Sequence, residues 1–305
     1  MVDDKLKKNE GEQLLKKFTE GKYNELVDEI EKLLKEYEDS PFAYSLLGNA
    51  LFNLKNFKDS IKAFEKEIKV SEEEHFLPYY NLGRNYEMLN NSELEISNYL
   101  KSFTLNPKKF ETNYNLGMAY SRIEDHDNAE KYLTNAHILK KDEPMALINL
   151  LALLFKMKKY SLGIEFASQA NEEFEKYFQY CYNYALLLYE TKNIEESNIM
   201  NEKAMVNMQT ENSPIFLDSL GLKTNILNDQ LKNEESINVS FEILKNDQNH
   251  YSALKSLVKS YAHLGNHRAS IFFNRLADGN IRFEIKDNGN IDLFLYHKEK
   301  ISIDG

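Results

Sequence analysis

The chain has 305 residues, of which 42% are hydrophobic and 29% charged, and 49 acidic against 38 basic residues give a formal net charge of -11. This acidic balance argues against a nucleic-acid backbone as the main partner, because phosphate binding needs a basic surface. The single cysteine, Cys181, excludes an intrachain disulfide framework.

No stretch of the sequence is typical of a membrane or secreted protein. Residues 1–8 lack the apolar core of a signal peptide. The most apolar run, from Met145 to Met157, is about 13 residues long and contains Asn149, so it is too short to span a bilayer. We therefore expect a cytoplasmic protein that does not insert into a membrane.

The first 75 residues contain two stretches with the apolar spacing of paired helices. In residues 7–40, a turn-like Gly21-Lys22-Tyr23 precedes apolar residues spaced as on one face of a helix. The next stretch opens with Ser40-Pro41. This is a favoured helix start, because proline at the first helical position loses no hydrogen bond that the helix needs.

A short motif then recurs at a fixed interval, as in Tyr80-Asn81-Leu82-Gly83 and Tyr114-Asn115-Leu116-Gly117. The interval is 34 residues, and it separates four asparagines: Asn81, Asn115, Asn149 and Asn183. Such a period indicates a helical repeat, in which two antiparallel helices cannot bury their apolar faces without neighbours.

The repeat resembles the tetratricopeptide-repeat family. Residues 110–143 are similar to one family unit, with Leu116, Gly117 and Tyr120 in the first helix and Ala129 and Ala136 in the second. Small residues at such positions let two helices cross closely. The resemblance implies an all-α, right-handed superhelical solenoid of antiparallel helix pairs over residues 1–284. Its units are expected near 7–40, 41–75, 76–109, 110–143, 144–177, 178–211, 212–250 and 251–284.

The period slips in the seventh unit, where the intervals on both sides of Gly221 are a few residues longer than the pattern predicts. Insertions in repeat proteins usually fall in the turns between helices. We therefore expect the extra residues at the polar stretch Asn228-Asp229-Gln230.

The tail departs from the helical pattern. Ile281, Phe283 and Ile285 alternate with polar residues, residues 287–290 have the composition of a turn, and alternation resumes at Ile291. We expect a short β-hairpin that begins near residue 281 and ends within residues 285–305. It either caps the solenoid or offers an edge strand to a partner or to a second copy.

The resemblance also implies a binding surface. In the family, first helices line a concave groove, and asparagines at the sixth position of a unit bond to the backbone of extended peptides. A carboxamide offers a donor and an acceptor, so it suits a peptide unit of any sequence. The alternative is that part of the column is family consensus and that the adjacent tyrosines are core residues. The predicted peptide-binding residues are Asn49, Asn81, Arg84, Asn115, Asn149, Asn183, Tyr80, Tyr114 and Tyr182.

Some family members bind the C-terminal carboxylate of chaperones through lysines and asparagines. The corresponding positions here are Ser45, Asn49, Asn81, Glu111 and Asn115. The asparagines of the first two helices are present, but every cation is missing. A buried carboxylate would have no counter-charge at these positions, so capture of a chain terminus is not expected.

No catalytic constellation is recognisable. Asp125-His126-Asp127 lies at an expected turn, where such residues cap and solvate helices. Cys181 occupies a position that is normally buried, which favours a core thiol. The run Glu72-Glu73-Glu74-His75 is typical of a solvated acidic turn. Phosphate loops, zinc-protease motifs and nucleophile elbows are absent from the sequence. We expect no enzymatic activity, no metal and no cofactor.

Three kinds of function remain. The favoured one is a non-enzymatic scaffold or adaptor that holds a protein or peptide segment in the concave groove. The second is a substrate-recruiting accessory of a glycosyltransferase-, sulfotransferase- or hydroxylase-type enzyme. The third is a self-assembling structural protein, a homo-oligomer joined through the solenoid end or the C-terminal hairpin.

Overall fold

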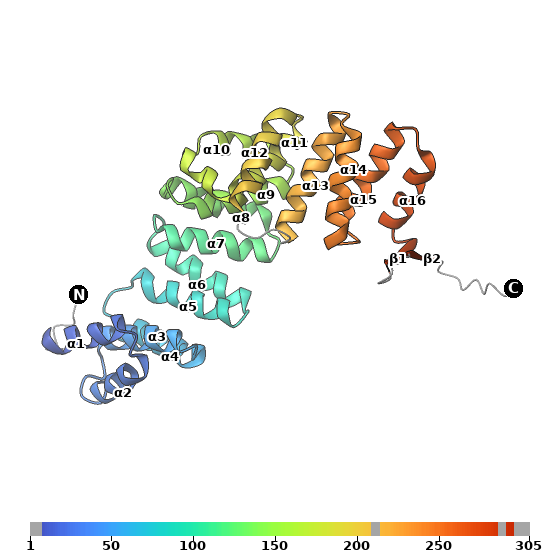
Figure 1. Ribbon diagram of the computed structural model, residues 1–305. Helices are drawn as coiled ribbons and strands as arrows, with labels where there is room; N and C mark the ends of the chain where they lie inside the picture. Colours follow the sequence, from blue (N-terminus) through green and yellow to red (C-terminus); the bar gives the residue numbers. More distant parts are fainter. Residues whose placement is uncertain (1–7, 209–213, 286–290, 296–305) are drawn as a thin grey trace. The chain divides into compact units, whose positions relative to one another are not determined.

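The computed structural model of the protein describes residues 8–208, 214–285 and 291–295 (Figure 1). It divides into two compact units, unit 1 with residues 1–153 and unit 2 with residues 154–305. In both units the helices follow one another in pairs, and the members of a pair pack together. The predicted all-α architecture of helix pairs is therefore confirmed for the helical part of the chain.

Unit 1 contains four helix pairs and most of a ninth helix, which crosses its boundary. The bounds are α1 (Lys8–Thr19), α2 (Tyr23–Leu33), α3 (Pro41–Asn53), α4 (Phe57–Val70), α5 (Phe76–Met88), α6 (Ser92–Leu105), α7 (Phe110–Arg122), α8 (His126–Leu139) and α9 (Pro144–Lys156). The predicted start of α3 is confirmed, because the Ser40 side chain accepts a hydrogen bond from the Ala43 N–H and Pro41 opens the helix.

Unit 2 continues the pattern and ends in two strands. The bounds are α10 (Tyr160–Ser168), the 3₁₀ helix η1 (Glu172–Lys176), α11 (Phe178–Glu190), α12 (Ile194–Asn207), α13 (Pro214–Asp229), α14 (Asn233–Asn246), α15 (Tyr251–His263), α16 (His267–Ala277), β1 (Ile281–Ile285) and β2 (Ile291–Leu295).

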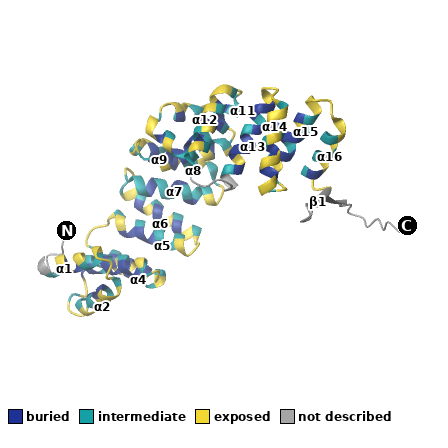
Figure 2. Ribbon diagram, in the orientation of Figure 1, coloured by how far each residue is buried: buried dark blue, intermediate teal, exposed yellow. Residues whose placement is uncertain are grey.

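A glycine in the middle of the first helix lets the pairs α3/α4, α5/α6 and α7/α8 pack closely. Gly48 lies against the ring of Phe64, and Gly83 lies against the ring of Tyr99. A Cβ atom added to Gly83 would stand 2.5 Å from the Tyr99 ring. Buried residues accordingly lie where paired helices face each other (Figure 2). The large second-helix residues fill the space that the glycines leave open.

The turn inside each pair has the same backbone conformation, whatever its sequence. One residue there has a positive φ angle, which costs free energy unless the residue is glycine. Glycine takes this place at Gly21 and Gly265. The other described turns use non-glycine residues: Lys55, Asn90, Glu124, Lys158, Lys192 and Leu231.

The extra residues of the seventh unit lengthen a helix and do not form the expected turn. Asn228 and Asp229 are the last residues of α13, which has 16 residues where α11 has 13. The Asn228 side chain is buried and bonds to the hydroxyls of Ser256 and Ser260 on α15. The polarity of Asn228 suggested a loop, but the two serines satisfy the hydrogen-bonding groups of its side chain inside the core.

The second helix of the fifth unit is unusually short. α10 has 9 residues, whereas α8 and α12 each have 14. The Tyr180 hydroxyl of α11 donates a hydrogen bond to the Ala167 carbonyl at 2.8 Å near the end of α10. The chain then forms η1, whose Phe174 is buried and packs edge-on against Tyr180. These two aromatic residues thus take the space at the missing last turn.

At the C-terminal side, β1 and β2 pair antiparallel, with Ile281 opposite Leu295 and Ile285 opposite Ile291. The predicted turn at residues 287–290 lies outside the described residues. The two strands form a sheet of their own, so each has one edge without a strand partner in the described part of the chain.

Candidate functional site

The nine predicted site residues all lie on first helices. In unit 1 they come from α3, α5, α7 and α9, and in unit 2 Tyr182 and Asn183 come from α11. All of them except Asn81 are half-buried. Burial raises the pKa of the Tyr182 hydroxyl, as it does that of Tyr80 and Tyr114.

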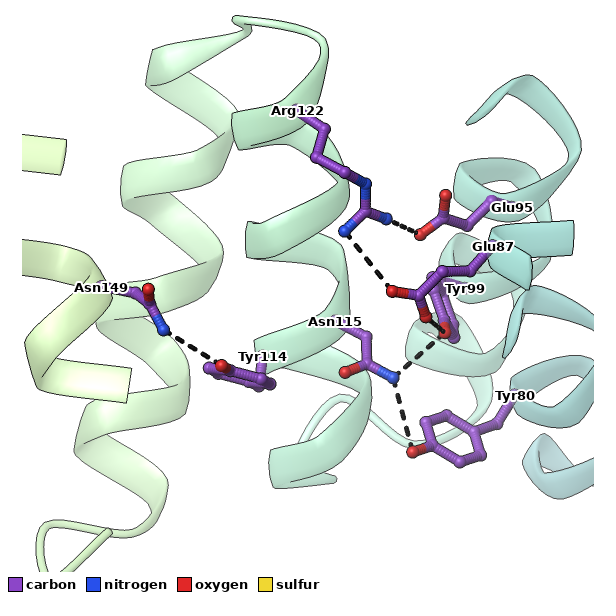
Figure 3. Close-up of polar contacts among 8 residues, drawn as sticks. All are labelled: Tyr80, Glu87, Glu95, Tyr99, Tyr114, Asn115, Arg122 and Asn149. Carbon is purple, nitrogen blue, oxygen red and sulfur yellow. Dashed lines mark hydrogen bonds and ion pairs between the residues drawn. The ribbon is translucent and has the colours of Figure 1, made fainter. Parts of the chain in front are cut away.

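Asparagines of unit 1 bond to tyrosines of the preceding repeat. Asn149 donates from Nδ2 to the Tyr114 hydroxyl at 3.0 Å, and Asn115 donates from Nδ2 to the hydroxyls of Tyr80 at 3.4 Å and Tyr99 at 3.0 Å (Figure 3). In Figure 3 the Oδ1 atoms of both asparagines make no bond to the other residues drawn. The amides therefore join neighbouring repeats through their donors.

The two other predicted asparagines of unit 1 have different environments. Asn81 is 8% exposed, so its side chain offers little surface to a ligand. Asn49 is half-buried on α3 and donates from Nδ2 to the Ser45 carbonyl of its own helix at 2.8 Å. The 34-residue spacing thus does not give Asn81 the environment of Asn115 and Asn149, and Asn49 lies outside that spacing.

Arg84 lies on α5 beside these residues. Its guanidinium stands 4.3 Å from the ring centroid of Phe52 on α3 and 6.0 Å from that of Tyr80, one turn earlier on its own helix. Both distances are within the range of cation–π attraction, and the stacking limits where the guanidinium points. The predicted residues Tyr80, Arg84 and Asn115 are therefore brought together by the fold.

A charged network that the sequence analysis missed lies next to this cluster. Arg122, the last residue of α7, pairs with Glu95 and lies 3.5 Å from Glu87, which accepts a hydrogen bond from the Tyr99 hydroxyl at 3.3 Å (Figure 3). The Glu95 side chain is only 2% exposed. Burial raises its pKa, and Arg122 acts in the opposite direction.

The sequence does contain a signal for this network. Glu95 occupies a second-helix position at which other repeats have the small residues Ser60, Ala129 and Ser197. A carboxylate at such a crossing requires a partner, because an unpaired buried charge is costly.

Glu67 is a second acidic residue at a small-residue position, which Ser102 and Ala136 hold in the next two repeats. It is 5% exposed, and its Oε2 atom has no hydrogen-bond partner. Burial raises its pKa to about 7, against a smaller lowering by the Ser45 hydroxyl. Around neutral pH this carboxyl is thus close to its titration midpoint.

Glu111 is held at the start of α7 by two lysines. Its carboxylate is 2.8 Å from Lys109 Nζ and 3.1 Å from Lys140 Nζ. Burial tends to raise its pKa, but hydrogen bonds from Lys109, from its own backbone N–H and from Lys140 outweigh burial and hold the pKa at about 2. This glutamate is therefore ionised and neutralised at physiological pH.

The residues considered for catalysis have structural roles. Asp125 caps α8 by accepting a hydrogen bond from the Asn128 N–H, as predicted for that turn. Cys181 is buried and its thiol contacts the Glu175 carbonyl oxygen at 3.0 Å, which confirms the predicted core thiol. Burial raises the pKa of this thiol to about 11, so it is not an activated nucleophile.

Metal ligation and membrane insertion find no support among the described residues. There, no group of three or more histidine, cysteine, aspartate or glutamate side chains is placed to hold a metal ion. In the same part of the chain, none of the helices combines the length and apolar character needed to cross a bilayer.

Comparison with known proteins identifies the repeat. The tetratricopeptide-repeat family matches residues 43–74, 78–109 and 110–136. No curated protein sequence matches the chain.

Solved structures with this fold share little sequence with the chain. The C-terminal part of a tetratricopeptide-repeat protein from Cytophaga hutchinsonii is 13% identical, with a TM-score of 0.64 over 81% of this chain and 99% of that one. PilF of Pseudomonas aeruginosa is 13% identical, with a TM-score of 0.56 over 70% and 95%. YrrB, described as having an unusual peptide-binding site, is 17% identical, with a TM-score of 0.53 over 59% and 92%. At these identities the likeness concerns the fold.

Proposed function

We propose that this chain, whose residues 43–74, 78–109 and 110–136 match the tetratricopeptide repeat, is a non-enzymatic scaffold that binds an extended segment of a partner protein. The proposed surface is the first-helix face of unit 1. It consists of half-buried residues on α3, α5, α7 and α9: Ser45, Asn49, Tyr80, Arg84, Tyr114, Asn115, Met118 and Asn149.

The observation that carries the proposal is the pair of asparagine–tyrosine bonds across repeat boundaries. Asn115 and Asn149 fix the hydroxyl ends of Tyr80 and Tyr114, so these rings have little freedom to lose when a ligand covers them. Surfaces ordered before binding lose less entropy in the complex. Tyrosine is also favoured at interfaces, since it combines a large apolar face with a polar group.

Asn81 is left out of the proposed surface because it is buried. The proposed surface includes Met118, whose flexible side chain offers an adaptable apolar contact. The peptide-binding site named for YrrB is a property of that protein, and it supports the proposal only as an example of the fold in this use.

The proposal is tested by selection from a pool of random peptides with amidated C-termini. The face variant combines Asn49→Ala, Arg84→Ala and Met118→Ala, one substitution on each of α3, α5 and α7. The control variant combines Ser97→Ala, Lys66→Ala and Ile138→Ala, which are exposed residues of second helices in the same unit. Circular dichroism first establishes that both are folded.

We expect the wild type and the control variant to enrich the same peptides, and the face variant to lose them. Equal enrichment by all three proteins would mean that the peptides bind to another surface. Enrichment by none of them would contradict peptide binding itself.

A further inference from the structure

We infer that the first-helix face of unit 1 selects acidic segments, and that Arg84 binds the carboxylate of an aspartate or glutamate side chain of the partner. This inference rests on the proposed function and adds the chemical class of the ligand. The observation behind it is a stacked, half-buried guanidinium that has no anionic partner within the described part of the chain.

The environment of Arg84 leaves its donors available. Its interactions with described residues are those with the rings of Phe52 and Tyr80, and they include no ion pair and no hydrogen bond. Stacking uses the face of the guanidinium and leaves its N–H groups around the edge. Two parallel N–H groups on one edge match the two oxygens of a carboxylate.

Two acidic residues that act on this cluster already lie beside other cations. Glu111 and Glu87 both act electrostatically on the Tyr80 hydroxyl. Glu111 is paired with Lys109 and Lys140, and Glu87 lies 3.5 Å from the Arg122 guanidinium. Arg84 differs from the exposed lysines without ion pairs, such as Lys66, because it is half-buried and its guanidinium is held against two rings.

The single positive charge of Arg84 favours some kinds of anionic ligand over others. A phosphate group carries up to two charges and is usually bound by clusters of cations, whereas Arg84 is one cation. Capture of a chain terminus in the family's manner requires lysines at positions that are Ser45 and Glu111 here. A single side-chain carboxylate matches the charge and the geometry of Arg84.

The neighbouring groups suit the rest of such a segment. The Oδ1 atom of Asn115 makes no bond to the other residues drawn in Figure 3 and can accept from a peptide N–H. Tyr80 and Tyr114 offer ring surface on either side. The acidic residue would thus be read within an extended stretch whose backbone contacts the asparagine.

The test uses the full chain and four peptide pools of equal length, random except for a central aspartate, asparagine, phosphoserine or alanine, all with amidated C-termini. A fifth pool has a central alanine and a free C-terminal carboxylate. Binding is measured for the wild type, for Arg84→Gln, and for Lys66→Gln, which removes an exposed lysine from α4 of the same unit.

We expect the wild type and Lys66→Gln to prefer the aspartate pool over the asparagine pool by about tenfold, the size of one charge-assisted pair. Arg84→Gln should still bind peptides and should treat the two pools alike. An aspartate preference that survives in Arg84→Gln would overturn the inference, as would strongest binding of the phosphoserine or the free-carboxylate pool.

Failure of the proposed function has a different signature, which is the absence of binding to every pool by every protein. If Arg84→Gln does not fold, the comparison of aspartate and asparagine peptides on the wild type decides whether acidic segments are selected. Arg84→Lys then decides the role of the stacked guanidinium. It keeps the charge but loses the paired donors, so the preference should weaken and not vanish.

Discussion

Asn149 donates a hydrogen bond to the Tyr114 hydroxyl at 3.0 Å, and these two residues belong to successive repeats. The same relationship joins Asn115 to Tyr80. A tyrosine on one first helix is thus bonded to the asparagine 35 residues later on the next. The asparagine column of unit 1 therefore contributes to the contact between repeats, whatever it does for a ligand.

Removing one hydroxyl measures this contact. Tyr114→Phe should lower the free energy of unfolding by about 0.5–1.5 kcal/mol, the typical contribution of one hydrogen bond. The control is Tyr44→Phe on α3, a half-buried tyrosine whose hydroxyl has no hydrogen bond to a described residue. Urea unfolding followed by circular dichroism gives both values. Equal effects of the two changes would mean that the Asn149–Tyr114 bond contributes nothing measurable.

Gly83→Ala should lower the free energy of unfolding by more than Tyr114→Phe does. The added methyl group would stand 2.5 Å from the Tyr99 ring, which is completely buried and has no room to move away. Overpacking of this kind costs about 1–3 kcal/mol. Gly221→Ala is the comparison, because its nearest neighbours are 3.1 Å away or more. A thermal unfolding midpoint that falls no further for Gly83→Ala than for Gly221→Ala would contradict the packing described here.

Leu231→Gly should stabilise unit 2. Leu231 has a φ angle of 59° and is 69% exposed, so its side chain contributes little packing while its backbone is strained. Relief of a left-handed conformation is worth about 1 kcal/mol. Asn90→Gly serves as the control, since asparagine tolerates this conformation better than leucine. The idea fails if Leu231→Gly unfolds at the same or a lower denaturant concentration than the wild type.

The buried Glu67 carboxyl predicts a pH dependence of stability. Its pKa is raised from an ordinary 4.5 to about 7 in the folded protein. The folded state therefore binds the proton of this carboxyl more tightly than the unfolded state does. Protonation of Glu67 stabilises the folded state fully below pH 4.5, and this stabilisation is lost as the pH rises to about 7. The difference amounts to about 3 kcal/mol.

Glu67→Gln should remove this dependence, because the amide keeps the shape of the carboxyl and does not titrate. Glu65→Gln, an exposed neighbour on α4, should retain it. Chemical denaturation at pH 5, 6, 7 and 8 gives the comparison. If the wild type and Glu67→Gln show parallel profiles, the carboxyl does not titrate as described.

Much of the fold was predictable from the 34-residue period. The period and the small residues at Gly48, Gly83 and Ala129 identify the helix pairs, and the Ser40-Pro41 start is visible locally. The turn at Lys55 is not, because nothing in its own sequence favours a positive φ angle. There the repeat context determines the backbone.

The candidate site was predictable only in part. The column of asparagines was visible, but the partner of Asn149 is a hydroxyl 35 residues away, and only the stacking of helices brings the two together. Asn81 has the same spacing and is nevertheless buried. The extra residues of the seventh unit were expected in a turn because Asn228 is polar, whereas they extend α13 and the partners of Asn228, Ser256 and Ser260, lie in the next repeat.

The buried Glu95 affects which first helix can pack against α6 during folding. Its counter-charge, Arg122, ends α7. The equivalent helices α3, α5 and α11 end in the uncharged or acidic residues Asn53, Met88 and Glu190, whereas α9 ends in Lys156. A misassembled chain in which α3, α5 or α11 followed α6 would bury the Glu95 carboxylate without a cation, at a cost of several kcal/mol. Glu95 therefore disfavours these three exchanges, and Arg122→Met should increase the fraction of chains that refold into swapped dimers, measured by light scattering.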